Sequence, residues 1–382
     1  MEASGNLQIM SAFIRFEIDE VVVPARMEMI APFAAGNWDR VPIILVRGFT
    51  EEGCEAVGEA GRGVPRQVVD ATLQTLLRRD LRSIHPASVW EGESPKPLLP
   101  GIFPSGSLDR RNPSQSLVET LWLDAVGKLS GLPAHALLGG KIRDGVRVDA
   151  WANRPPAKAL TALVTKAAAA GYTGLKLKCS AAGDTILALT EIADEVPPGF
   201  GFTIDPMCAL RTFNESARLL ERLAQLPFPV RLEDPFPHDA PLQWQRIRQL
   251  FPIPLIWHAR SLEQVRFGLR EGLADGFNIA GDPAFGFVAA SGMVAGSALH
   301  CWHGASLEMG IMQAARLHAC SVAAACELAS DLSSHWVREH TLLANHPPVR
   351  RGCMTVPDEP GLGVHLDDKA IVRYRVARWV VE

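Results

Sequence analysis

The sequence predicts an α/β protein in which an N-terminal α+β region precedes a parallel (β/α) barrel. From residue 146 onward, short apolar strands alternate with helices rich in alanine and leucine, a pattern typical of a parallel sheet. Three of these strands end in Lys178, Asp205 and Glu233, which are spaced 27 and 28 residues apart. That spacing fits one strand, one loop and one helix. About seven such units favour a closed barrel over an open sheet.

The region before the barrel combines strands and helices. Alternating or apolar runs predict strands at 13–23, 43–47 and 56–60. Helical spacing of valine and leucine predicts helices within 66–85 and 114–139. Between them, residues 86–106 contain many prolines and are expected to form a loop.

The barrel region has seven candidate strands. They are short apolar runs at Val146–Ala152, Thr173–Lys178, Gly201–Asp205, Val230–Glu233, Pro254–His258, Gly276–Ile279 and Leu299–His303. Helices are expected at 157–170 and 211–225. Near the C-terminus, residues 356–363 form a turn cluster, and residues 371–381 are expected to form a final strand.

Composition excludes several classes of protein. The 382 residues are 47% hydrophobic and 21% charged, as in a globular protein with a large core, built as two domains or as one barrel with additions. A net charge of −4 predicts no binding to nucleic acid or to an anionic membrane. Seven scattered cysteines without a Cys-x-x-Cys pair favour buried thiols in the cytoplasm over disulfides or a structural zinc. The weakly polar stretch 288–299 is too short to span a bilayer.

Several motifs, in this order along the chain, resemble the mandelate racemase / muconate lactonizing enzyme branch of the enolase superfamily. They are the hairpin 51–60 that ends in Gly58-Glu59-Ala60, the helix around Leu123–Lys128 with Gly131-Leu132-Pro133 and Leu137–Lys141 after it, and Val356-Pro357 through Pro360–Val364. Between them lie the Lys-x-Lys, Asp and Glu-Asp-Pro segments.

The resemblance implies a modified (β/α)7β TIM-like barrel with an α+β capping domain. Residues 1–140 would form the capping domain and residues 141–350 the catalytic barrel. Residues 351–382 would return to the capping domain. Loops of the capping domain, namely 32–40 with Trp38 and the proline-rich loop around Trp90, would then contact the substrate.

The resemblance also implies a chemistry. Enzymes of this branch remove the proton next to a carboxylate, and a divalent metal stabilises the negative charge that develops. It places Asp205 and Glu233 as ligands of Mg²⁺, Lys178 as the base, and Lys176 beside it to orient the substrate carboxylate. Residues two apart in a strand face the same side, so both amines can enter one pocket. A lysine that acts as a base near neutral pH needs its pKa lowered by about 3 units, through a like charge and burial.

The third metal ligand departs from the family pattern. The family has a carboxylate at the end of the next strand, whereas this chain has Trp257-His258-Ala259-Arg260. His258 as a nitrogen ligand would favour another divalent ion over magnesium. Alternatively, the Arg260 guanidinium could pair with the two acids in place of a metal, or a two-carboxylate magnesium site could remain. Met207 also replaces the asparagine that is common two residues after this aspartate.

The far side of the expected pocket is irregular as well. His303 resembles the histidine that ends the seventh strand and is the candidate acid/base opposite Lys178. Its carboxylate partner is expected near Gly276, where Asp275 is the neighbouring candidate, although a shift of one residue points a side chain the other way. No lysine lies in 275–287, which disfavours the lactonizing arrangement, yet Glu308 matches a glutamate of the other subgroup.

Three hypotheses follow for function. The first is metal-assisted abstraction of the proton alpha to the carboxylate of a hydroxy or sugar acid, giving dehydration or racemisation. The second is a catalytically degenerate family member that binds a small acid or a partner, because the third carboxylate is missing. The third is muconate-lactonizing or epimerase-type chemistry, which Glu308 favours. The expected partner is a small carboxylic acid, and barrels of this kind often self-associate, so a homo-oligomer is expected.

Overall fold

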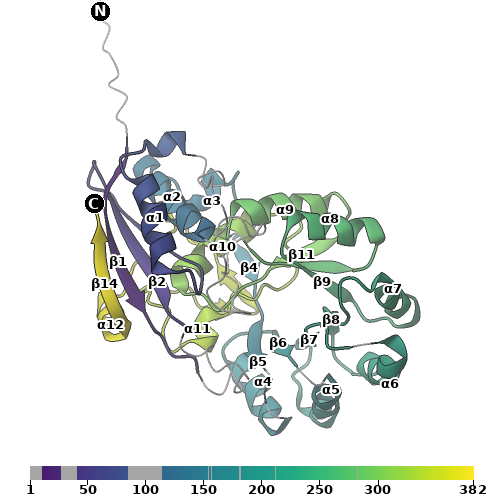
Figure 1. Ribbon diagram of the computed structural model, residues 1–382. Coiled ribbons are helices and arrows are strands. Elements are labelled where there is room, and N and C mark those ends of the chain that lie inside the picture. The colour runs from purple at the N-terminus through teal and green to yellow at the C-terminus, as the bar shows by residue number, and fades with distance from the viewer. Residues whose placement is uncertain are drawn as a thin grey trace, which may run out of the picture.

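The chain builds a four-stranded antiparallel sheet, a seven-stranded parallel sheet and a small three-stranded sheet. The computed structural model describes residues 11–26, 41–84, 114–153, 155, 157–179, 182–210, 212–281 and 283–382. In Figure 1, the antiparallel sheet with helices α1 and α2 lies at one side, and the parallel sheet with its surrounding helices lies at the other. The loops expected to hold Trp38 and Trp90 lie outside the described residues.

The antiparallel sheet has the strand order β14-β1-β2-β3. Its strands are β1 (Phe13–Val21), β2 (Ile43–Thr50), β3 (Glu55–Glu59) and β14 (Arg375–Val381), and the last strand of the chain therefore pairs with the first. The helices of this region are α1 (Arg66–Leu76), η2 (Leu81–Ser83), α2 (Gln115–Ser130) and α3 (Ala134–Leu137). Strand β3 packs tightly on α2, because a Cβ added at Gly58 would lie 2.5 Å from Leu121 Cγ.

The expected C-terminal strand is only partly correct. The residues before β14 form helix α12 (Asp368–Tyr374), so the strand begins at Arg375 and not at Ile371. The side chain of Asp367 accepts a hydrogen bond from the Ala370 peptide N–H at 3.0 Å. This N-cap starts a helix where the apolar pattern alone favoured a strand.

The parallel sheet confirms the predicted TIM-like barrel. Its order is β11-β10-β9-β8-β7-β6-β5, so each strand pairs with its neighbour in sequence. The strands are β5 (Ala150–Asn153), β6 (Gly174–Lys178), β7 (Gly201–Asp205), β8 (Val230–Glu233), β9 (Leu255–Ala259), β10 (Gly276–Ile279) and β11 (His300–His303). Around the outside lie η4 (Ala157–Ala159), α4 (Leu160–Ala169), α5 (Ala182–Glu191), η5 (Ala193–Glu195), α6 (Phe213–Ala224), α7 (Pro241–Leu250), α8 (Leu262–Glu271), α9 (Phe285–Ala295) and α10 (Gly310–Val322) (Figure 1).

The segment 328–331 closes the ring between β11 and the start of the barrel. On one side, Leu328 and Asp331 donate their peptide N–H groups to carbonyls of β11, at 3.2 Å each. On the other side, Ser330 N–H donates to Arg147 O at 2.8 Å and Ser330 O accepts from Asp149 N–H at 3.1 Å. The segment therefore occupies the place of an eighth strand, and it carries Asp331 into the barrel. At this seam, β4 (Gly145–Arg147) precedes β5 and pairs with β13 (Cys353–Thr355), which pairs with β12 (Val349–Arg350) to complete the small sheet.

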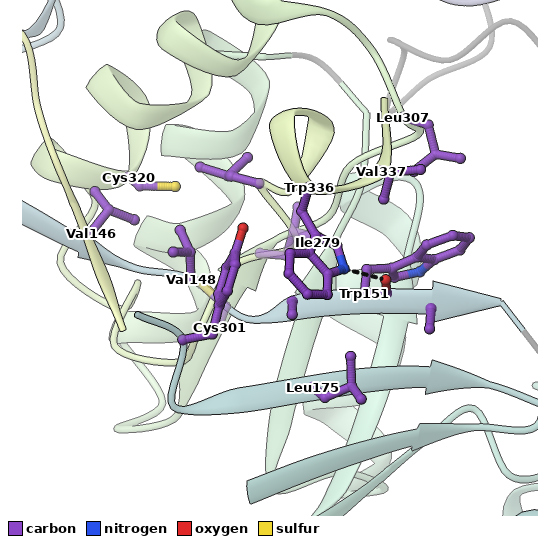
Figure 2. Close-up of a cluster of buried hydrophobic side chains, with 14 of the residues drawn as sticks. Val146, Val148, Trp151, Leu175, Ile279, Cys301, Leu307, Cys320, Trp336 and Val337 are labelled. Carbon is purple, nitrogen blue, oxygen red and sulfur yellow. Dashed lines mark hydrogen bonds between the residues drawn. The ribbon is translucent and has the colours of Figure 1, made fainter. Parts of the chain in front are cut away.

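Buried apolar side chains fill the space around this seam. Figure 2 shows side chains from β4, β5, β6, β10, β11, α10 and α11 (Ser334–Val337) gathered in one cluster. The Trp336 indole N–H donates to Trp151 O at 3.0 Å, which fixes α11 against β5. Each large apolar side chain buried here contributes about 1.5–3 kcal/mol. Among the helices in the described ranges, none is both long enough and apolar enough to cross a membrane.

Candidate active site

The carboxyl ends of the barrel strands bring the predicted amines and carboxylates together. Lys178 lies opposite Asp205 in the register of β6 and β7. His258, Asn278 and Trp302 lie side by side in the register of β9, β10 and β11. Because alternate strand residues face the same side, these positions form a ring of inward-pointing side chains at one end of the barrel.

The Lys176 ammonium is the centre of this ring. Its Nζ lies 2.7 Å from Glu233 Oε2, 2.8 Å from Asp331 Oδ2 and 3.8 Å from Asp205 Oδ2. The residue is only 2% exposed. Burial alone would lower the pKa of Lys176, but the three carboxylates together hold that pKa above its ordinary value. Lys176 is therefore a permanent positive charge in the floor of the site.

Lys178 is the more accessible of the two amines. Its side chain is 18% exposed, and its Nζ lies 2.6 Å from Asp205 Oδ2. The other carboxylate oxygen of Asp205 accepts the Met207 peptide N–H at 3.0 Å. Met207 thus supports Asp205 through its backbone, which adopts a left-handed conformation with φ of 52°. A partly exposed amine beside a buried carboxylate is placed to exchange a proton with a small molecule.

Glu233 is fully buried and surrounded by donors. It accepts hydrogen bonds from Lys176 and from Asn278 Nδ2, the latter at 2.8 Å. His258 Nδ1 lies 3.3 Å from Glu233 Oε1. Burial alone would raise the pKa of Glu233, but Lys176 and His258 hold that pKa well below its usual range. Glu233 is therefore ionised and can ligate a cation.

Of the two candidates for the third ligand position, His258 is the one that reaches the acids. Arg260 is exposed, and its peptide N–H donates to Gln264 Oε1 at 2.7 Å, just before α8. By contrast, His258 Nε2 is buried and has no hydrogen-bond partner within the described part of the chain. A buried ring nitrogen without a partner is available to a ligand.

The donor types present fit a divalent ion. Asp205 and Glu233 supply carboxylate oxygens and His258 supplies an imidazole nitrogen, a set that suits a transition ion better than magnesium, which prefers oxygen. Both carboxylates are already paired with lysine amines, so an ion would share them with Lys176 and Lys178. These three residues are the ones that would hold it.

His303 does not join this ring. Its imidazole is fully buried and stacks on Phe287 of α9, with ring centroids 4.2 Å apart. Its Nδ1 and Nε2 lie 2.8 Å from Gly304 O and 3.2 Å from Pro283 O. Since neighbouring strand residues face opposite sides, the inward position of Trp302 turns His303 outward. The structure therefore places the predicted acid/base on the outer face of the barrel.

Asp275 and Glu308 are also held elsewhere. Asp275 precedes β10, at the opposite end of the strand from the site, and it binds Arg248 at 2.7 Å and the Leu255 peptide N–H at 2.9 Å. Glu308 forms a buried ion pair with Arg316 at 2.6 Å. It shares with Asp331 the lining of a small cavity of about 10 Å³. The predicted His303–Asp275 pair is therefore not assembled.

Sequence reasoning missed four inward-facing residues. Asp331 binds Lys176, Asn278 binds Glu233, and the Trp302 ring centroid lies 5.5 Å from Lys176 Nζ. Asn153 pairs with Lys178 in register. The period of two along β10 could have identified Asn278, whereas β11 is apolar or aromatic on both faces and no strand pattern marks Asp331.

Several polar atoms of this ring are buried without a partner among the described residues. They are both amide atoms of Asn153, Asn278 Oδ1, Trp302 Nε1 and His258 Nε2. Buried polar groups are normally hydrogen-bonded, and each unpaired one costs about 1–3 kcal/mol. A polar ligand would satisfy these donors and acceptors.

Comparisons with known proteins agree with this fold. The family model described as Enolase C-terminal domain-like matches residues 159–370, more than half of the chain. The o-succinylbenzoate synthase of Geobacillus stearothermophilus is 24% identical over 91% of this chain and 93% of its own length. The probable glucarate dehydratase of Streptomyces coelicolor is 29% identical over 69% of this chain and 65% of its own length. The structure of 2-chloromuconate cycloisomerase from Rhodococcus opacus 1CP shares the fold, with a TM-score of 0.77 and 19% identity over 96% of this chain and 100% of that chain.

The family model and the two curated relatives, named as a synthase and a probable dehydratase, support an enzyme with the proton-abstraction chemistry of the superfamily. The matched region contains the Lys-x-Lys motif and both acids at the strand ends. The chain belongs to the enolase superfamily, in its mandelate racemase / muconate lactonizing enzyme branch.

Proposed function

We propose that the chain is a lyase that removes the proton alpha to the carboxylate of a hydroxy or sugar acid and then eliminates water. One observation carries this proposal: the partly exposed Lys178 amine faces a ring whose opposite wall, among the residues that the structure describes, offers no second base. The side chains there are the Asn278 amide and the Trp302 indole, which do not take up a proton near neutral pH. Racemisation needs an acid/base group on each face of the substrate, so a single lysine favours elimination.

The binding groups suit a polyhydroxy carboxylate. Lys176 offsets part of the negative charge of Asp205, Glu233 and Asp331, which would otherwise repel the substrate carboxylate. The unpaired atoms of Asn153, Asn278 and Trp302 offer donors and acceptors for hydroxyl groups. Because these groups are buried, each hydrogen bond to substrate forms in a low-dielectric site, where it is stronger than in water. The name of the probable glucarate dehydratase supports a sugar acid as the substrate class.

The proton then has a direct path. Lys178 Nζ takes the proton from the α-carbon and can return it to the departing β-hydroxyl on the same face, which leaves as water. A divalent ion held by Asp205, Glu233 and His258 would stabilise the charge on the substrate carboxylate and would compete with Lys178 for Asp205. Lys176 and Asn278 keep Glu233 ionised and in position throughout.

The test is α-proton exchange and elimination in D₂O, followed by NMR with a panel of hydroxy and sugar acids and with Mg²⁺, Mn²⁺ or Co²⁺ present. Lys178→Ala should lower both rates by about 10²–10⁴-fold, the usual contribution of a general acid/base. Lys158→Ala, a change of an exposed lysine on η4, should leave both unchanged. Exchange that survives Lys178→Ala would refute the assigned base, and racemisation without elimination would refute the lyase.

A second candidate is a binder without chemistry. It is favoured by His258 at the place of the third carboxylate, and by the ion pairs that occupy both lysines. In that case acids of the panel would bind, as measured by calorimetry, without any α-proton exchange under any of the three ions.

Lactonizing or epimerase chemistry would need a second lysine where β10 presents Asn278. A cytoplasmic location and self-association stay predictions from the sequence.

A further inference from the structure

Beside the ring, three donor side chains of different chemistry converge at the same end of the barrel. Cys208, Asp234 and His238 each offer one ligand atom, and these three atoms lie within 4.8 Å of one another. Cys208 follows β7 by three residues, whereas Asp234 and His238 lie in the loop between β8 and α7. Within the described part of the chain, these residues are the one group of at least three His, Cys, Asp or Glu side chains whose ligand atoms lie this close together.

The backbone of both loops is shaped to bring these residues together. Cys208 N–H donates to Asp234 O at 2.7 Å, which ties one loop to the other. Cys208 and Asp234 both adopt left-handed conformations, with φ of 61° and 41°, although neither is glycine. Such conformations cost about 1–3 kcal/mol each and persist where the surrounding structure enforces them. The loops therefore hold the thiol and the carboxylate in a defined relation.

The imidazole of His238 is oriented in advance. Its ring stacks on Trp257 with centroids 3.9 Å apart and an interplanar angle of 18°. Trp257 is itself buried and packs on Trp244 at 4.9 Å, so it is a rigid platform. His238 Nε2 lies 2.9 Å from Asp234 Oδ1. A donor held in this way loses little side-chain entropy when it binds an ion.

We propose that Cys208, Asp234 and His238 form a second metal site, which binds a divalent transition ion of the zinc type. A thiolate sulfur, an imidazole nitrogen and a carboxylate oxygen are the donors that zinc accepts, whereas magnesium does not take sulfur. In tetrahedral zinc, bonds of about 2.0–2.3 Å place the ligand atoms about 3.5 Å apart. The more distant donors would thus approach by up to about 1 Å, while His238 Nε2 and Asp234 Oδ1 would separate slightly. Both Cys208 and His238 are only half-buried and can make these movements.

Binding replaces one proton and leaves one position open. The ion takes the place of the thiol proton of Cys208, which passes to water, while His238 binds through Nε2 and keeps its single ring proton on Nδ1. Three protein ligands leave a fourth position for water or another small donor, as in exchangeable rather than purely structural zinc sites. The site differs from the proposed catalytic ring, which contains no sulfur donor.

The site is mechanically connected to the ring. Asp234 directly follows Glu233, and its Oδ1 also accepts the His258 peptide N–H at 3.0 Å. Cys208 lies on the loop whose Met207 N–H binds Asp205. An ion bound here clamps the two loops that position Asp205, Glu233 and His258. It therefore acts as a positioning element next to the ring and takes no part in proton transfer.

The test uses Co²⁺ as a spectroscopic substitute for zinc on the full chain under reducing conditions. A thiolate bound to Co²⁺ gives a near-ultraviolet charge-transfer band, which oxygen and nitrogen ligands alone do not give. We expect the band to saturate at no more than two equivalents, because the ring can take up a second ion, and to disappear when excess Zn²⁺ is added. Cys208→Ser should abolish it, whereas Cys353→Ser, which removes another partly exposed thiol, should retain it.

His238→Gln provides a second, milder variant. It keeps the thiol and should weaken Co²⁺ binding, read from the same band, by at least about tenfold, since one of three ligands is lost. Absence of the band in the unmodified chain at saturating Co²⁺ would overturn the proposal, as would a band that survives Cys208→Ser or an affinity that His238→Gln leaves unchanged. Since the readout is the thiolate band, its failure leaves the proposed lyase activity untouched.

Discussion

Lys176 shows how one residue can set the electrostatics of the whole site. Three carboxylates, of Asp205, Glu233 and Asp331, lie within 4.0 Å of its ammonium nitrogen, and all four residues are buried. Burial raises the pKa of Asp331, and the negative charge of Glu233 raises it further, although Lys176 opposes both effects. Taking charges out of water is costly, so this group is stable only while the cation is present.

We therefore expect Lys176→Met to lower the free energy of unfolding by about 3–5 kcal/mol, because it leaves buried carboxylates without a counter-charge. Urea denaturation followed by circular dichroism measures the change. Lys158→Met, at an exposed position on η4, should leave the unfolding free energy nearly unchanged. Equal stability of the two variants would mean that the buried carboxylates are neutralised by another route.

His258 is the residue that decides which ion the ring accepts. Replacing its nitrogen donor with an oxygen donor in His258→Asp would complete a three-carboxylate set, so we expect Mg²⁺ affinity to rise by at least about tenfold. Isothermal titration calorimetry of both proteins with Mg²⁺ measures this. His300→Asp, at the exposed start of β11, adds the same charge away from the ring and should change nothing. An unaltered Mg²⁺ affinity in His258→Asp would show that this position is not a ligand position.

At the scale of elements, the close approach of β3 to α2 depends on one glycine, Gly58. A methyl group at Gly58 would lie 2.5 Å from Leu121 Cγ and 3.1 Å from Leu117 Cδ1, closer than van der Waals contact permits. Both leucines are fully buried and cannot move into solvent. The strand thus approaches the helix as closely as it does because position 58 has no side chain.

Gly58→Ala should accordingly lower the free energy of unfolding by about 1–3 kcal/mol through overpacking. Gly292 on α9 is the matched position, because nothing lies within 4 Å of a Cβ added there and its backbone is helical. Gly292→Ala should raise the unfolding free energy by up to about 1 kcal/mol through helix propensity. Chemical denaturation of both variants checks the signs, and a stabilising Gly58→Ala would contradict the packing described.

At the scale of the molecule, two buried carboxylates join the antiparallel-sheet region to the barrel. Glu59 at the end of β3 accepts the peptide N–H groups of Met309 and Met312, at 2.6 and 2.9 Å, at the start of α10. Glu119 on α2 accepts that of Ala284 at 2.9 Å, at the start of α9. Helix N-termini attract negative charge, so each carboxylate ties one region to a helix of the other.

Burial opposes the ionisation of both groups. It raises the pKa of Glu59 from 4.5 to about 8, although the peptide N–H groups of Met309 and Met312 lower it. It raises the pKa of Glu119 to about 7, against the hydrogen bond from Gln115 and those of the helix. Between the unfolded value and the folded value, the folded protein binds more protons than the unfolded chain. The stability from these groups is therefore complete at low pH and is lost as the pH rises through the folded pKa.

We expect Glu59 to contribute a fall of the unfolding free energy with rising pH up to about pH 8, and Glu59→Gln to remove that contribution, because glutamine does not ionise. Urea denaturation at several pH values in this range measures both slopes. Glu221→Gln, at an exposed position of α6, should keep the slope of the original chain. An identical slope in Glu59→Gln would show that Glu59 does not titrate in this range.

The sequence by itself predicted the barrel and the three residues that end its consecutive strands, Lys178, Asp205 and Glu233. Strand and helix periods alternate clearly, and Lys178, Asp205 and Glu233 end consecutive parallel strands, so any such barrel must bring their side chains to one mouth. Local pattern also identified His258 as a departure from the family. These features follow from chain order and from the two-residue period of a strand, and both can be read without coordinates.

Only the tertiary structure decided the remaining features. The four-residue strand β11 is apolar or aromatic on both faces, so its pattern cannot tell whether Trp302 or His303 points inward. Asp331 lies in a segment that closes the barrel through hydrogen bonds to both of its ends, a pairing that local sequence does not encode. Cys208 and His238 meet because left-handed turns fold two loops together. Each case depends on contacts between distant segments, whose energy exceeds the weak local preferences of the residues involved.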